Sequence, residues 1–153
     1  PSYYLCRAFP GAGSVRTAFT AFRDGATAFE GLDKQAFYEA LAAFLLRMHA
    51  RGAFHRDLSA GNVLARVASG HAEFAVIDTG RARFFDCPLP LRHRLADLKR
   101  IAHPLPWPER QTFVGLYLES LGRRFTPARR LPFTLYDWKH RIKRWVRPLR
   151  GKR

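Results

Sequence analysis

The feature that most constrains this fold is an apolar helical stripe that runs directly into a polar loop and two short apolar segments. Asp33 is typical of a helix N-cap, and Gly52 is typical of a helix end. Between them, the apolar residues that share one helical face are Phe37, Leu41, Phe44, Leu45 and Met48. Residues 62–67 and 74–77, joined by Ala68-Ser69-Gly70-His71, are typical of a β-hairpin. Helix, loop and hairpin in this order favour one α+β unit.

Weaker patterns on both sides predict further elements. Residues 3–9 are aromatic and apolar enough to favour a strand. Residues 14–31 are interpreted as a loop that contains a short helix. An amphipathic segment over 91–101 is followed by prolines, and Pro108 suits the first position of another helix that runs to about Leu121. We expect its inward residues to be Phe113, Leu116, Tyr117 and Leu121. No repeat or flexible linker divides the chain.

Composition limits the classes of protein that fit. The chain has 153 residues, 47% of them apolar, which is enough for one core. No apolar run is long enough to span a bilayer, and two cysteines are too few for a disulfide scaffold, which favours a reducing compartment. No signal peptide is visible, and a first residue other than Met suggests that an upstream part is missing. The net charge of +15 favours anionic partners.

The chemistry-bearing residues lie around the hairpin. The loop His55-Arg56-Asp57-Leu58-Ser59-Ala60-Gly61-Asn62 precedes the first strand, and Asp78 follows the second. Because a hairpin brings the start of one strand beside the end of the next, Asn62 and Asp78 should meet at one rim. Two carboxylates and one amide oxygen are hard ligands that suit Mg²⁺. The alternative is that Asp57 and Asp78 only cap loops and turns, which are common roles for Asp.

These residues resemble a known pattern. HRDLSAGN reproduces the H-R-D-L-x-x-x-N catalytic loop of protein-kinase-like phosphotransferases, and Val76-Ile77-Asp78-Thr79-Gly80 resembles their D-F-G segment, with Thr79 in place of Phe. The continuation Arg81-Ala82-Arg83-Phe84 and the later Leu95-Ala96-Asp97-Leu98-Lys99-Arg100 are similar to the lipopolysaccharide kinase family. Its members phosphorylate heptose or 3-deoxy-manno-octulosonic acid in the lipopolysaccharide inner core. The resemblance covers about residues 3–121.

The resemblance implies a fold. We expect a mainly helical, protein-kinase-like C-terminal lobe with a short catalytic β-hairpin over residues 1–136, in which 1–13 form a hinge strand and linker. The first lysine is Lys34, so no strand lysine of an N-terminal lobe precedes it, and neither does a Gly-rich loop. Gly11-Ala12-Gly13 is interpreted as a turn. We therefore expect the N-terminal lobe to be absent and the isolated chain to be inactive.

The resemblance also implies roles. It implies an ATP-dependent kinase in which Asp57 orients or deprotonates the attacking sugar hydroxyl. Asn62 and Asp78 would hold Mg²⁺ against the ATP phosphates, since phosphoryl transfer needs mainly positioning and charge neutralisation. In the same catalytic loop, His55 and Arg56 are expected to brace the backbone rather than to react. Further positions implied by the pattern are Arg81 and Arg83, which would contact an anionic acceptor, and Asp97, which would anchor the loop backbone.

The basic tail predicts a surface contact. From residue 139 to the end there are eight cations and no acid. Trp138, Ile142 and Trp145 share one helical face, so residues 137–153 favour an amphipathic helix. Residues 138–153 would then contact an anionic membrane surface, which suits a lipid-linked sugar acceptor and a cytoplasmic protein at the inner face of the inner membrane. The alternative is that the Trp face packs on the lobe.

Two rival functions stay open. A basic module that binds nucleic acid or membrane without catalysis is allowed by composition, but no nucleic-acid motif is present and the HRDLSAGN segment would have no role. A kinase-like phosphotransferase with another acceptor, a small molecule or a protein, fits the same motifs. Histidines at positions 49, 71, 93, 103 and 140 show no convincing metal spacing and are interpreted as structural.

Overall fold

The computed structural model describes residues 9–150, with side chains as far as residue 142. The strand predicted over 3–9 lies outside the described residues apart from Phe9. The elements in chain order are β1 (Gly13–Ser14), α1 (Val15–Arg23), β2 (Ala28–Phe29), β3 (Leu32–Asp33), α2 (Lys34–Ala50), β4 (Ala53–Phe54), β5 (Val63–Ala68), β6 (His71–Val76), the 3-10 turn η1 (Thr79–Arg81), β7 (Arg83–Phe84), α3 (Leu91–Ile101), α4 (Trp107–Glu119) and α5 (Pro127–Arg150).

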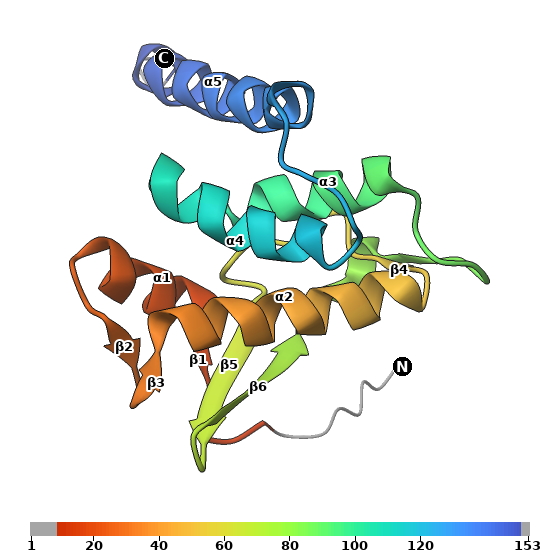
Figure 1. Ribbon diagram of the computed structural model, residues 1–153. Helices are drawn as coiled ribbons and strands as arrows, with labels where there is room; N and C mark the ends of the chain where they lie inside the picture. The colour runs from red at the N-terminus through yellow and green to blue at the C-terminus, as the bar shows by residue number, and fades with distance from the viewer. Residues whose placement is uncertain (1–8, 151–153) are drawn as a thin grey trace, which may run out of the picture.

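Helix α2 forms the centre of the molecule. Figure 1 shows the β5–β6 hairpin on one side of α2, with α3 and α4 on the other side and α5 beyond them. The predicted N-cap is confirmed, because the Asp33 carboxylate accepts hydrogen bonds from the backbone N–H groups of Gln35 and Ala36. The helix ends at Ala50 and Gly52 follows in a left-handed conformation, as the pattern predicted.

The predicted apolar faces were correct only in part. On α2, Phe37, Leu41 and Leu45 are fully buried, whereas Phe44 and Met48 are partly buried. The reason is that α2 packs against α4 and β6 together, so the buried arc is wider than one stripe. On α4, Phe113 and Tyr117 are buried as predicted. Leu116 and Leu121 are partly buried and pack against the core, whereas Val114 and Leu118, which the pattern did not predict, are fully buried.

The predicted β-hairpin is confirmed, and its register is regular. Val63 pairs with Val76 and Ala68 pairs with His71, so the turn is Ser69-Gly70. β1 adds a third strand beside β5, and β2 pairs with β3 in a second small hairpin that begins inside the segment interpreted as a loop with a short helix and ends beyond it. A third pairing, between β4 and β7, joins segments far apart in sequence.

Helix α5 runs without interruption from Pro127 to Arg150, and the boundary predicted after residue 136 falls inside it. Its inner side packs against α3, and Phe133 is fully buried. Its outer side leaves Trp138 64% exposed and Ile142 41% exposed. The alternative in which the Trp face packs on the lobe is therefore wrong for these two residues, and the side chain of Trp145 lies outside the described part. No helix in the described part of the chain could cross a membrane.

Candidate active site

The loop over residues 55–62 lies between β4 and β5 and is shaped by its own backbone. The N–H of Ser59 donates to the carbonyl of Asp57 at 2.8 Å, and the N–H of Asn62 donates to the carbonyl of Ser59 at 2.9 Å. Leu58 and Ala60 are fully buried, which pins the loop to the core, while the Asp57 side chain is 44% exposed. The loop therefore presents one carboxylate to solvent from a fixed backbone.

Asp97 on α3 holds the start of this loop. Its carboxylate is fully buried and accepts hydrogen bonds from the N–H of His55 at 2.9 Å and of Arg56 at 3.0 Å. Charge-assisted hydrogen bonds of this kind are about twice as strong as neutral ones. The sequence-based prediction that Asp97 anchors the loop backbone is confirmed by these contacts.

A buried polar chain lies behind Asp97. Arg94 donates to the Tyr117 hydroxyl at 3.2 Å, so that hydroxyl gives its proton to Nδ1 of His49 at 2.7 Å. The Nε2–H of His49 then faces the Asp97 carboxylate at 3.5 Å. Burial lowers the pKa of His49 and outweighs the Asp97 carboxylate, and burial raises the pKa of Tyr117 to about 12. Burial therefore disfavours the charged forms of both His49 and Tyr117.

Asn62 and Asp78 are brought together by the base of the hairpin, as predicted. The N–H of Ile77 donates to the carbonyl of Asn62 at 3.0 Å, which places the next residue, Asp78, beside the loop. The Asn62 amide donates to the Asp57 carbonyl at 2.9 Å, so its NH₂ group faces the loop. His55 completes the link, because its Nε2 donates to the Ile77 carbonyl at 2.9 Å. The bracing role predicted for His55 agrees with this contact.

Two residues of the site have strained backbones. Arg56 has φ 68° and Asp78 has φ 56°, in the left-handed region that side chains other than Gly rarely adopt. Such conformations cost on the order of 1–3 kcal/mol and cluster at functional sites. Here the strain turns the chain at both ends of the candidate site, once before Asp57 and once after β6.

Arg81 and Arg83 lie on the segment that follows Asp78. Arg81 ends η1, and its Nη1 lies 3.5 Å from Oδ2 of Asp57, although the Arg81 side chain is 77% exposed. Arg83 is exposed on β7 and pairs with Phe54 of β4, directly before the loop over residues 55–62. The structure thus brings Arg81 to the candidate base and places Arg83 on the adjoining strand.

Close backbone packing holds β7 in this position. The N–H of Phe85 donates to the carbonyl of Gly52 at 3.1 Å. Gly52 has φ 76°, and a Cβ there would lie 1.9 Å from the Phe85 carbonyl oxygen. Only glycine fits this approach, so the glycine at the end of α2 also fixes the segment that carries Arg83.

The donor set suits a magnesium ion. Asp57, Asn62 and Asp78 supply carboxylate and amide oxygens from two linked backbone segments, and Mg²⁺ is usually held by one or two carboxylates together with water and substrate phosphates. Within residues 9–142, no three His, Cys, Asp or Glu side chains gather in a way that could hold a metal by themselves. A metal at this position would therefore need the Asn62 oxygen and phosphate oxygens.

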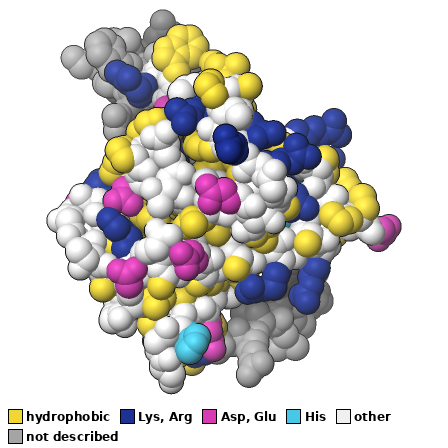
Figure 2. Space-filling view, in the orientation of Figure 1, with side chains coloured by type: hydrophobic (Ala, Val, Ile, Leu, Met, Phe, Trp, Pro, Cys, Tyr) yellow, Lys and Arg dark blue, Asp and Glu magenta, His cyan; other side chains and the backbone are white. Residues whose placement is uncertain are grey.

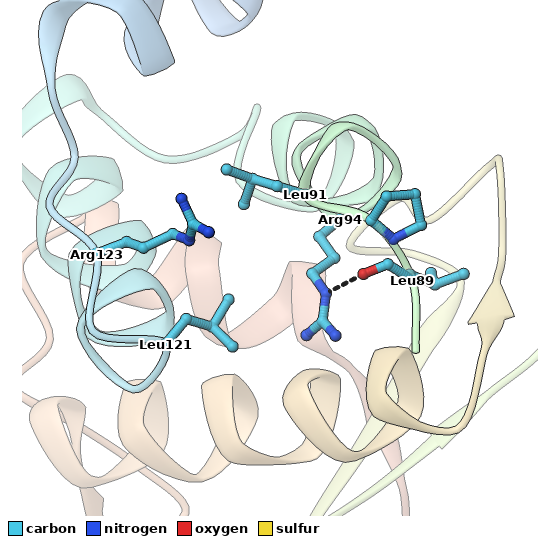
Figure 3. Close-up of a pocket in the computed structure, with 6 residues that line it drawn as sticks. Leu89, Leu91, Arg94, Leu121 and Arg123 are labelled. Carbon is cyan, nitrogen blue, oxygen red and sulfur yellow. Dashed lines mark hydrogen bonds between the residues drawn. The ribbon is translucent and has the colours of Figure 1, made fainter. Parts of the chain in front are cut away.

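A separate pocket lies away from the loop. Its volume is about 340 Å³, and it is lined by Leu89, Pro90, Leu91, Arg94, Leu121 and Arg123. Figure 3 shows Arg94 donating to the Leu89 carbonyl, at 2.7 Å, with Arg123 on the opposite side of the pocket. Arg94 therefore lines this pocket and also donates to the Tyr117 hydroxyl in the buried polar chain behind Asp97.

Sequence reasoning missed the residues that support Asp97. His49, Tyr117 and Arg94 come from three helices, and the sequence pattern predicts only a structural role for His49 and a core position for Tyr117. The sequence offered one indication of this role: polar side chains stand on the buried faces of helices, and buried polar groups need hydrogen-bond partners. Which partners they find depends on how the helices pack.

Comparisons with known proteins show the family and the fold. The model of the lipopolysaccharide kinase (Kdo/WaaP) family matches residues 4–117. Among solved structures, the chain is similar to "WaaP in complex with acyl carrier protein", with a TM-score of 0.60 and 20% identity, and the likeness confirms the predicted α+β, kinase-like fold. It covers 89% of this chain and 58% of that chain, so this chain spans little more than half of that structure. No curated protein matches the sequence.

Proposed function

The chain belongs to the lipopolysaccharide kinase (Kdo/WaaP) family, and from this premise we propose that it transfers the γ-phosphoryl group of ATP to a sugar hydroxyl of the lipopolysaccharide inner core. The observation that carries the proposal is the link between Asp57, Asn62 and Asp78 through the loop and the base of the hairpin. A phosphotransferase needs a group that positions the nucleophile beside groups that neutralise phosphate charge.

Asp57 is the candidate base. Its carboxylate is accessible, so an acceptor hydroxyl can donate a hydrogen bond to it and pass it a proton as the bond to phosphorus forms. Asn62 and Asp78 would hold Mg²⁺, which would bring the ATP phosphates to the site and neutralise part of their charge. His55, Arg56 and the buried Asp97 keep the loop in shape and take no part in bond making.

Two parts of a kinase-like enzyme have no counterpart among these 153 residues. Neither a Gly-rich loop over the phosphates nor a strand lysine precedes the hairpin. We therefore expect negligible ATP turnover by residues 1–153 alone. The partner molecules in the proposal are ATP and a lipid-linked sugar acceptor, and we place the protein in the cytoplasm at the inner face of the inner membrane, where residues 138–153 would meet anionic lipid.

The test uses a protein that carries both this chain and a kinase N-terminal lobe. We expect Asp57→Ala and Asp78→Asn each to reduce phosphoryl transfer to an inner-core glycolipid by at least a hundredfold, as general-base and metal-ligand losses do. Asn is used at position 78 because it tolerates the left-handed backbone. Mass analysis of the products identifies the acceptor, and full activity in either variant would refute that residue's role.

The same assay separates the rival acceptors. If phosphate appears on a protein or on an unrelated small molecule and never on the glycolipid, the family chemistry stands and the proposed acceptor is wrong. If neither acceptor is phosphorylated and the protein only binds vesicles or oligonucleotide, the non-catalytic module is the better description.

A further inference from the structure

A cluster of cations lies between α3 and α5, beside the candidate base. We define the α3–α5 cationic surface as Lys99, Arg100 and Lys139. The Lys99 ammonium lies 5.7 Å from the centre of the Tyr136 ring, and the Arg100 guanidinium lies 6.0 Å from the same centre. Tyr136 of α5 therefore has two cations of α3 against its ring, and the aromatic face orients both of them.

This surface adjoins the catalytic loop. Arg100 follows Asp97 by less than one helical turn, so it comes from the side of α3 that holds the loop. Arg81 contacts Asp57 itself. The charge of Asp57 also reaches Tyr136, because it contributes to the raised pKa of that phenol, for which burial is the main cause. Asp57 and the cations of α3 therefore lie on the same side of the molecule, near Tyr136.

The cations of α3 and α5 are not neutralised by the protein. Among the described residues, no carboxylate lies within ion-pair distance of Lys99, Arg100 or Lys139. Asp137, the nearest acid on α5, is already bound by His103 at 2.7 Å and Arg110 at 2.6 Å. The pKa of Lys99 is lowered by burial and by the charges of Arg100 and Lys139. Uncompensated like charges at close quarters favour an anionic ligand.

We infer that the α3–α5 cationic surface binds a phosphate or carboxylate group carried by the acceptor sugar, while a hydroxyl of that sugar reaches Asp57. The inference rests on the proposed function, and it adds the surface that would hold the anionic group of the acceptor. Arg81 contacts the candidate base, and its guanidinium also suits phosphate and carboxylate oxygens. Figure 2 shows that Lys and Arg side chains also gather elsewhere on the molecule, so a test must separate this surface from general positive charge.

The experiment measures binding to the full 153-residue chain and needs no turnover. Mannose 6-phosphate and mannose are titrated at constant ionic strength, and amide shifts are followed by NMR. We expect saturable shifts at residues 57, 99–100 and 136–139 with the phosphorylated sugar only. The double variant Lys99→Gln/Arg100→Gln should bind at least tenfold more weakly. The matched control Arg123→Gln/Arg124→Gln removes the same charge from exposed positions and should change affinity less than twofold.

Other outcomes would refute either this inference or the proposed function, and they differ for the two. Equal weakening in both double variants would show attraction to net charge only, and shifts confined to other residues would place the site elsewhere. A parallel arm uses phosphatidylglycerol vesicles: if they shift these residues and the soluble sugar phosphate does not, the surface binds lipid headgroups. Binding of the sugar phosphate without phosphoryl transfer by a lobe-containing protein would refute the proposed function and leave this subsite standing. Phosphoryl transfer to a neutral sugar, without binding of the sugar phosphate, would refute this subsite and support the proposed function.

Discussion

The carboxylate of Asp97 accepts a hydrogen bond from the backbone N–H of His55 at 2.9 Å, across 42 residues of sequence. This contact joins α3 to the start of the loop over residues 55–62 in the buried interior. Because Asp97 binds backbone N–H groups, it holds the loop whatever side chains the loop carries. The shape of the candidate site therefore depends on a residue that no substrate touches.

The first prediction concerns this carboxylate. Asp97→Asn removes the charge and leaves one acceptor oxygen for two backbone donors, so a buried N–H loses its partner. We expect the free energy of unfolding to fall by about 2 kcal/mol or more. Urea unfolding measures it. Asp24→Asn, at an exposed pair with Arg23, should change stability by less than about 0.5 kcal/mol. Equal effects in the two variants would contradict the anchoring role.

A second prediction tests the close approach at the end of α2. Gly52→Ala places a Cβ against the Phe85 carbonyl and also strains a left-handed backbone, so it should unfold more easily than Gly70→Ala. Gly70 has a similar φ of 75° but nothing near the added Cβ. We expect the Gly70 variant to lose about 1 kcal/mol and the Gly52 variant clearly more. Thermal unfolding compares them, and similar losses would mean that β7 is not held by this contact.

The third prediction concerns pH. Because burial lowers the pKa of His49, the unfolded chain takes up a proton on this imidazole near pH 6.5 while the folded chain does not. The unfolded state then binds more protons, so the free energy of unfolding must fall as the pH drops below about 6.5 until the folded-state pKa is reached. One such group contributes at most about 1.4 kcal/mol per pH unit.

His49→Asn isolates this contribution. The amide oxygen can still accept from the Tyr117 hydroxyl but does not titrate. We expect a variant that is less stable at about pH 7.5, with a shallower loss of stability between about pH 7 and pH 5. The measurement is urea unfolding at several pH values. An unchanged slope would show that His49 is not the group responsible.

A fourth prediction concerns the outer face of α5. Leu131, Leu135 and Trp138 are 56%, 55% and 64% exposed. With Ile142 they fall within an arc of roughly 60°, opposite the buried Phe133. The face therefore begins two turns before the predicted tail. Such an apolar stripe suits the interface of a membrane, and nearby cations favour anionic lipid.

Vesicle flotation tests the stripe. Leu135→Ser/Trp138→Ser should reduce binding to phosphatidylglycerol vesicles at least tenfold, since burial of one such side chain contributes about 1.5–3 kcal/mol. Phe84→Ser, which removes an apolar side chain that is 76% exposed on β7, should have little effect. If the double variant binds normally, or if it converts a dimer to a monomer instead, the stripe serves another surface.

The sequence by itself determined the parts whose cause is local. The spacing of Phe37, Leu41 and Leu45 predicted α2, the Asp33 cap fixed its start, and the hairpin register placed Asn62 beside Asp78. Helical periodicity, capping and hairpin pairing depend on neighbours within a few residues, so they are visible without a fold.

Only the tertiary structure decided which distant groups meet. Three features depend on how the helices pack. His49 and Tyr117 support Asp97, α4 buries Val114 more fully than Leu116, and the Tyr136 ring of α5 lies against two cations of α3. Packing is set by the shapes of whole faces and by the need of each buried polar group for a partner, and residues far apart in sequence satisfy both conditions together.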